Sequence, residues 1–138
     1  MSGSTNSRYQ KFSPQLDLKS GVPVYRQIID QVLGGMSRGT LQPGDQLPTV
    51  RQLAVDLAIN PNTVVRAYRE LEIREILTTQ QGTGTFLTTK KPRADEVERQ
   101  RRITQLVTDT LAKAGADGIT LDELLEQFGE RKAEQNRR

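Results

Sequence analysis

Residues 47–71, LPTVRQLAVDLAINPNTVVRAYREL, restrict the fold more than any other part of the chain. They contain two short amphipathic patterns separated by a very short interval, which predicts two helices joined by a tight turn. The box Thr49-x-x-Gln52 suits the start of the first helix, and Asn60-Pro61 suits the start of the second. The second helix repeats apolar side chains at i, i+3, i+4 and i+7, namely Val64, Ala67, Tyr68 and Leu71. We interpret the segment as a helix-turn-helix.

Simpler patterns on both sides complete a small domain. A helical stripe over about residues 23–38 comes first, and LQPGDQLP, residues 41–48, is typical of a turn-rich connector. ILTTQQGTGTFLTT, residues 76–89, is rich in threonine around a Gly-Thr-Gly centre, which predicts a β-hairpin. A hairpin directly behind the second helix of a helix-turn-helix is a wing.

Two further amphipathic helices are expected near the C-terminus, the first over about residues 93–114. The second begins at the capping box Thr120-x-x-Glu123. The predicted fold class is mostly α with a small β-hairpin wing. The expected architecture is a winged helix-turn-helix head followed by a two-helix C-terminal dimerisation tail. The expected divisions are a flexible N-terminal arm at 1–19, a winged helix-turn-helix DNA-binding domain at 20–90, a two-helix dimerisation region at 91–131 and a frayed end at 132–138.

The composition removes several classes of function. The 138 residues include no cysteine and no histidine, which excludes disulfides, thiolate chemistry, histidine bases and the usual zinc sites. We expect no enzyme activity, no cofactor and no metal. No apolar run approaches the ~18 residues that span a bilayer, and MSGSTNSRYQKF lacks the apolar segment of a secretory signal. A cytoplasmic protein with no membrane partner is expected, and a net charge of +3 permits nucleic-acid binding without arguing for it.

The outward face of the second helix of the helix-turn-helix is polar and cationic, with no acidic residue from Asn60 to Arg69. A recognition helix meets the base edges of the major groove with its N-terminal half, where Asn62 and Thr63 stand. Arg66, one turn further, is long enough for a guanine edge or a phosphate. With the preceding helix and the tip of the wing included, the predicted DNA contacts are Arg51, Asn60, Pro61, Asn62, Thr63, Val65, Arg66, Arg69, Gln81, Gly82 and Thr83.

Less specific interpretations remain open for each of these residues. Arg66 and Arg69 also suit an ordinary solvated helix face, and Asn60 either caps the helix or touches a phosphate. Gly82 suits the turn of any hairpin. Two classes of function therefore stay open, a DNA-binding transcriptional regulator and a winged-helix module that contacts another protein and has no operator of its own.

The two C-terminal helices have apolar stripes that need a partner. One interpretation is that they fold back on the head and complete its core. The favoured interpretation is a homodimer, because two-fold symmetry sets two heads one helical turn of DNA apart, ~34 Å. The predicted dimerisation residues are Ile103, Leu106, Val107, Leu111, Leu121, Leu124, Leu125 and Phe128.

Over about residues 22–88 the chain resembles the DNA-binding head of the GntR family of bacterial transcription regulators. The elements PVYRQI, PGDQLPTVRQLA, INPNTVVRAYREL and GTGTF are most similar to its YtrA-like branch. The resemblance implies a homodimer that binds a double-stranded DNA operator, usually as a repressor, and leaves a small-molecule effector open. It implies DNA contacts at Arg51, Asn60, Asn62, Thr63, Val65, Arg66, Gln81, Gly82 and Thr83.

The chain departs from the family pattern at three places. Gln80-Gln81 stand before the glycine turn of the wing, where basic residues are common. Ile76 stands where the family usually has a glycine after the recognition helix, so we expect that helix to end differently. Val65 stands where other branches have an arginine, and Arg66 beside it points about 100° further around the helix.

Overall fold

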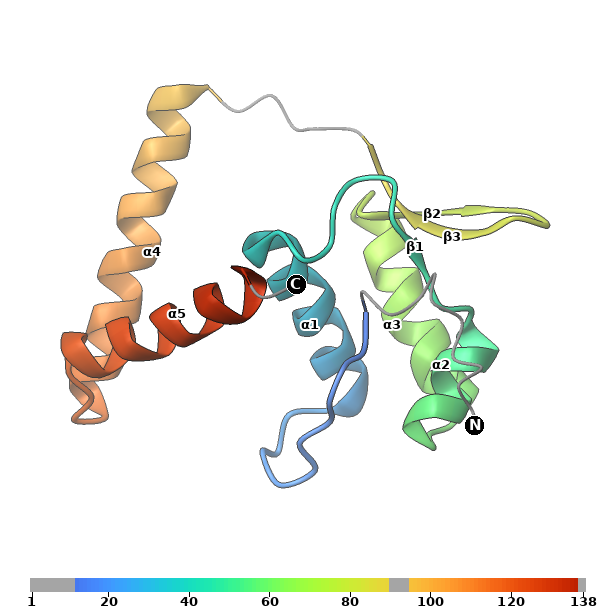
Figure 1. The fold of residues 1–138 in the computed structure, drawn as a ribbon, viewed down its shortest axis with the longest axis horizontal. Coiled ribbons are helices and arrows are strands. Elements are labelled where there is room, and N and C mark those ends of the chain that lie inside the picture. The colour runs from blue at the N-terminus through green and yellow to red at the C-terminus, as the bar shows by residue number, and fades with distance from the viewer. Residues whose placement is uncertain (1–11, 90–94, 137–138) are drawn as a thin grey trace. The chain divides into compact units, whose positions relative to one another are not determined.

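The computed structural model describes residues 12–89 and 95–136. It divides into two compact units, Met1–Lys90 and Lys91–Arg138, and the division falls between the expected head and tail. The described part of the head contains three helices and a small sheet, and that of the tail contains two helices (Figure 1). The predicted mostly helical fold with a winged helix-turn-helix is confirmed.

The helices of the head are α1 (Val24–Arg38), α2 (Val50–Leu57) and α3 (Pro61–Ile73). Both expected caps are present: Thr49 Oγ1 accepts from the Gln52 N–H at 3.0 Å, and Asn60 Oδ1 accepts from the Asn62 N–H at 2.8 Å. Between α2 and α3 the chain turns at Ala58, whose φ of 55° is left-handed. The helix-turn-helix is therefore formed by local signals that the sequence contains.

The sheet has one strand more than the expected hairpin. Strands β2 (Leu77–Gln80) and β3 (Gly84–Leu87) form the hairpin, and β1 (Gln46–Leu47) pairs with β3, giving the antiparallel order β1-β3-β2. The register places Gln46 opposite Phe86 and Leu47 opposite Thr85. The sequence predicted a turn-rich connector at residues 41–48 and no strand there, because a strand of two residues has no periodicity to detect.

The core of the head lies between the three helices and the sheet. Tyr68 is buried in it, and its hydroxyl donates to the Pro48 carbonyl at 2.7 Å, which ties α3 to the segment before α2. The buried hydrophobic cluster consists of Phe12, Ile28, Ile29, Val32, Leu41, Leu47, Leu53, Ala54, Val64, Ala67, Tyr68, Leu71, Leu77 and Leu87. The four residues expected on the inner face of α3 are all members of this cluster.

The segment before α1 differs from the flexible arm that was expected over residues 1–19. Residues 1–11 lie outside the described part, but Phe12 is only 6% exposed and belongs to the core cluster. Gln31 accepts from the Gln15 N–H at 2.9 Å and donates to the Gln15 carbonyl at 2.7 Å. Gln27 bonds both backbone groups of Asp17 in the same way, at 2.8 and 2.9 Å. Residues 12–17 are thus held against α1.

Helix α3 ends differently from the family pattern, as expected from Ile76 at the position where a glycine is usual. The left-handed residue is Glu75, with φ of 61°, one position earlier. The Ile76 N–H donates to the Leu71 carbonyl at 2.9 Å, which closes the helix end, and Ile76 packs against the core. The β-branched residue therefore avoids the disfavoured conformation, and a glutamate adopts it instead.

The tail consists of α4 (Glu96–Ala116) and α5 (Leu121–Asn136). Asp95 caps α4, and the expected box at α5 is formed, with Thr120 and Glu123 bonding each other at 3.0–3.2 Å. Helix α5 continues to Asn136, so the frayed end expected at 132–138 is not seen up to that residue, and residues 137–138 lie outside the described part. No helix in the described ranges is long and apolar enough to cross a membrane.

Candidate nucleic-acid interface

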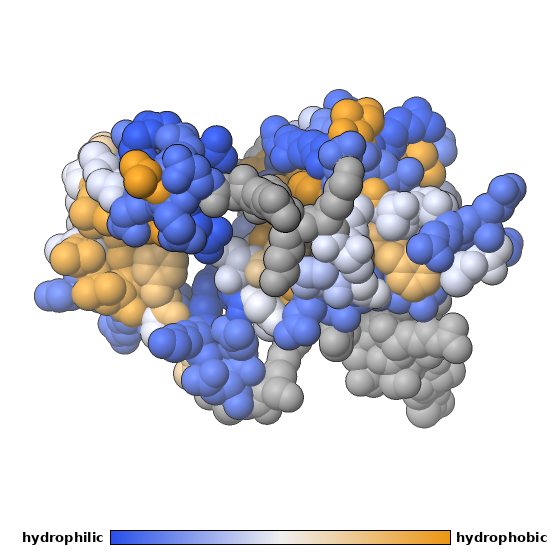
Figure 2. All heavy atoms as spheres, turned by 90° about the horizontal axis from the view of Figure 1, so that it is seen from above, coloured by the Kyte–Doolittle hydropathy of each residue, from blue (hydrophilic) through white to orange (hydrophobic). Residues whose placement is uncertain are grey.

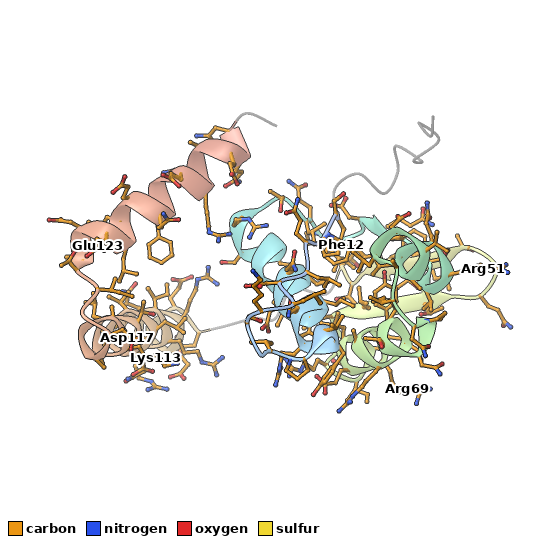
Figure 3. The ribbon with its side chains drawn as sticks, turned by 90° about the horizontal axis from the view of Figure 1, so that it is seen from below. Phe12, Arg51, Arg69, Lys113, Asp117 and Glu123 are labelled. Atoms are coloured by element: carbon orange, nitrogen blue, oxygen red, sulfur yellow. The ribbon has the colours of Figure 1, made fainter. Side chains whose placement is uncertain are left out.

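Helix α3 presents a polar and cationic surface on the side away from the core. Asn62, Arg66 and Arg69 are exposed, whereas Val65 is half-buried. These residues line one shallow surface hollow together with Glu70 and Ile73. Figure 3 shows Arg69 pointing away from the head, and Arg51 doing the same from the first turn of α2. The structure thus brings four of the predicted contacts, Asn62, Val65, Arg66 and Arg69, onto one face.

At the N-terminus of α3, fewer polar groups are available to contact DNA than the sequence suggested. The side-chain oxygen of Asn60 is used as the helix cap, so of the two alternatives left open for it the structure shows capping. The Thr63 N–H donates to the Asn60 carbonyl at 3.0 Å, and Thr63 is half-buried. Pro61 is exposed but has no N–H to donate. Asn62 is therefore the exposed polar side chain best placed at this end.

Arg66 has a neighbour that the sequence pattern did not reveal. Its guanidinium carbon lies 3.8 Å from the centroid of the Tyr25 ring on α1. Glu70, one turn after Arg66, lies at the edge of the same face and forms a long ion pair with Arg74, 3.7 Å between Oε2 and a guanidinium nitrogen. The segment Asn60–Arg69 is acid-free as expected, but the exposed face ends beside a carboxylate.

The tip of the wing is a small and uncharged turn. Gln81, Gly82 and Thr83 are all exposed, and the Thr83 N–H closes the turn on the Gln80 carbonyl at 2.9 Å. Gly82 has a φ of 79°, which favours glycine. The Gln46 side chain on β1 donates to the Thr83 carbonyl at 3.2 Å, so the third strand supports the tip.

We expect Gly84→Ala to destabilise the head more than Gly82→Ala. Both glycines have positive φ, 138° and 79°, so each alanine is strained. A Cβ on Gly84 would lie 2.5 Å from Gln46 Nε2, whereas a Cβ on Gly82 meets nothing within 4 Å. Gln46 Nε2 is the far end of a flexible side chain, so it moves aside and loses its hydrogen bond to the Thr83 carbonyl. We expect an extra loss of about 0.5–1.5 kcal/mol in the free energy of unfolding, measured by urea denaturation. Equal losses in the two variants contradict the role of Gln46 as a support of the tip.

The apolar side chains of the tail form an exposed surface. Leu106 on α4 is 67% exposed and Leu111 is 39% exposed, and Leu124 on α5 is half-buried. The other predicted dimerisation residues are also exposed: Ile103, Val107, Leu121, Leu125 and Phe128. Figure 2 shows a broad hydrophobic area on the tail. In the described part of the tail only Ala114 is a buried hydrophobic residue.

The polar side of α4 is already paired. Arg101 donates to Glu98 at 3.0 and 2.9 Å, and Arg102 donates to Glu98 at 3.2 Å. These hydrogen bonds, that of Arg101 first, lower the pKa of the exposed Glu98 carboxyl below its usual value. Gln105 donates to Asp109 at 2.8 Å on the same helix. These polar side chains of α4 are paired with one another, whereas the apolar surface of the tail is exposed.

Known proteins match this chain in sequence. The profile of bacterial regulatory proteins of the gntR family matches residues 24–87. The HTH-type transcriptional regulator YhcF of Bacillus subtilis is 38% identical over 109 residues, which cover 78% of this chain and 88% of that protein. The HTH-type transcriptional repressor YtrA of the same organism is 35% identical over 120 residues, covering 87% and 92%.

Solved structures extend the likeness to the fold. A GntR family transcriptional regulator from Listeria monocytogenes superposes with a TM-score of 0.57 at 34% identity, covering 82% of this chain and 98% of that one. The match is longer than the head unit alone, so it extends into the tail. These relatives are named as regulators and not as enzymes. The chain therefore belongs to the GntR family, on its YtrA-like branch, and is a transcriptional regulator with a DNA-binding winged helix.

Proposed function

We propose that the protein is a homodimeric repressor that binds a pseudo-palindromic operator, with α3 in the major groove and the wing in the minor groove. The observation that carries this proposal is the exposed face of α3, where Asn62, Arg66 and Arg69 gather and the one acid, Glu70, lies at the edge. A surface for a protein partner is usually apolar at its centre. The name of the similar YtrA protein, a repressor, supports the direction of regulation.

The contacts of α3 follow from how far each side chain reaches. Asn62 is in the first turn, where a recognition helix meets base edges, and an asparagine amide pairs well with adenine. Val65 offers a methyl surface for a thymine, and Arg66 reaches a guanine or a phosphate. Arg69 and Arg51 are exposed on adjoining helices and suit phosphates, which fix the register without reading sequence.

The wing contributes by its shape more than by its charge. Its tip contains Gln81, Gly82 and Thr83 and no cation, so a strong phosphate contact from the tip is not expected. A glutamine amide and a threonine hydroxyl both offer hydrogen bonds to the acceptors of a minor groove. The wing therefore adds modest affinity that depends little on salt.

A second copy of this chain is the proposed partner of the apolar surface of the tail. The surface extends over both α4 and α5, and the polar side of α4 is occupied by its own ion pairs. A single head touches few base pairs, and a dimer doubles them with two-fold symmetry. Two heads on one operator then require inverted half-sites about one helical turn apart.

Selection from a random-sequence DNA library by the wild-type protein tests the proposal. We expect an enriched motif with two inverted half-sites, and anisotropy titrations that favour the selected duplex over a scrambled one at two salt concentrations. Equal and steeply salt-dependent binding to both duplexes indicates electrostatic attraction alone. That result contradicts the proposed function and favours the module that contacts another protein. A motif with one half-site contradicts the proposed dimer on a pseudo-palindromic operator.

Arg66→Ala tests whether this arginine reads a base. The expected loss is about 1–3 kcal/mol on the selected duplex and much less on scrambled DNA. Arg102→Ala on the polar side of α4 is the matched control, because it also removes an exposed arginine charge, from an ion pair that contributes little to stability. An equal loss on both duplexes shows that Arg66 contacts only a phosphate.

A further inference from the structure

We propose that Tyr25 of α1 is a positioning residue for DNA recognition, because its ring holds the Arg66 guanidinium ready to bind DNA. The inference rests on the proposed function, in which α3 reads an operator. It assigns a role to a residue of the first helix, outside the helix-turn-helix. Tyr25 and Arg66 are far apart in the sequence, so only the folded head brings their side chains together.

The contact is a cation–π stack that leaves the arginine able to bind something else. The guanidinium carbon lies 3.8 Å from the ring centroid, well inside the ~6 Å at which such contacts attract. A stack uses the flat face of the guanidinium, whereas its N–H donors lie in the plane and point outward. Within residues 12–89 and 95–136, Arg66 has neither a hydrogen bond nor an ion pair.

The stack on Tyr25 matters for DNA binding because Glu70 is an alternative partner for Arg66. Glu70 follows Arg66 by four residues, so a helix brings the two side chains within reach of each other. The preferred order for such a pair has the acid first, and Glu70 is paired in that order with Arg74, at 3.7 Å. With Tyr25 on its other side, Arg66 stays away from Glu70 and keeps its charge for the DNA.

The Tyr25 side chain is held by the core, so its ring can restrict the conformation of the Arg66 side chain. It is half-buried and packs against the core cluster, whereas Arg66 is exposed. A free arginine side chain has many rotamers, and ordering it on binding lowers the affinity. A ring that already restricts the side chain removes part of this cost. Tyr25 thus strengthens binding through Arg66 without touching the DNA.

A double-mutant cycle on DNA affinity tests the inference. The variants are Tyr25→Leu, Arg66→Ala, the double variant and Tyr25→Phe, titrated on the duplex that the wild-type protein selects from a random library. We expect Tyr25→Leu to weaken binding about three- to fivefold, the worth of an exposed cation–π contact. Tyr25→Phe keeps the ring and retains wild-type affinity. In the Arg66→Ala background, Tyr25→Leu changes the affinity less than about 1.5-fold if the two act as a unit.

Urea denaturation of the same four proteins separates positioning from folding. Leucine keeps most of the apolar contact of Tyr25 with the core, so all four proteins are expected to be folded under the titration conditions. Equal and additive losses from Tyr25→Leu in both backgrounds overturn the inference, as does a threefold loss in Tyr25→Phe. A wild-type protein that enriches no motif overturns the proposed function instead, so the two failures are distinguishable.

Discussion

Leu106→Asp combined with Leu111→Asp is expected to convert the protein to a monomer that binds its operator about 10²–10⁴-fold more weakly. Both side chains lie on the apolar stripe of α4, 67% and 39% exposed in the single chain. In a dimer each aspartate enters an apolar interface, where an unpaired charge is strongly unfavourable. In the monomer both carboxylates are solvated, so the tail helices themselves remain formed. The loss of affinity follows because the second head no longer binds as part of the same molecule.

Light scattering during size-exclusion chromatography measures the mass, and anisotropy on the selected duplex measures the affinity. Gln105→Asp with Thr108→Asp is the control, since it adds the same two charges to exposed positions on the same helix outside the stripe. Circular dichroism confirms that helix content is unchanged. A stripe variant that stays dimeric refutes the proposed interface, and a monomer with wild-type affinity refutes the need for two heads.

The helix-turn-helix and the wing were predictable because their signals are local. Thr49, Asn60 and Thr120 cap the helices that follow them, and the Gly-Thr-Gly centre forms the turn of the hairpin. Such signals involve residues within a few positions of one another. The prediction that local caps start α2, α3 and α5 is confirmed at each of these three residues.

The parts that were missed depend on residues far apart in the sequence. β1 exists because Gln46 and Leu47 pair with a strand nearly forty residues later. A strand of two residues is too short for a sequence pattern to predict it. The stack of Arg66 on Tyr25 is of the same kind. Periodicity placed Arg66 on the outward face correctly but gave no information about which side chain of another helix lies beside it.

The end of α3 shows a different limit of sequence reasoning. The sequence predicted that Ile76 would not adopt the left-handed conformation, but it did not predict that Glu75 would adopt it instead. Helix ends are the least certain part of a pattern, because one residue of shift changes no apolar contact on the inner face. The bond from the Ile76 N–H to the Leu71 carbonyl fixes the end at the earlier residue.

Phe12→Ala is expected to lower the free energy of unfolding by about 3 kcal/mol, the lower end of the range for a buried phenylalanine. Phe12 is 6% exposed in the core cluster of the head, and Figure 3 labels it there. The lower value applies because Phe12 is in no helix or strand, so its segment relaxes into part of the cavity. Gln27 and Gln31 still bond the backbone of residues 15 and 17 in the variant, so the segment stays docked.

Leu18→Ala is the matched control, because Leu18 is in the same segment and is 79% exposed. Its unfolding free energy should stay within about 0.5 kcal/mol of wild type. Urea denaturation followed by circular dichroism measures both variants, and the slope with urea should be the same in each. If Phe12→Ala unfolds at the same urea concentration as Leu18→Ala, residues 12–17 behave as the flexible arm that the sequence suggested. A difference of several kcal/mol instead makes Phe12 part of the fold that holds α1, and with it Tyr25, against the recognition helix.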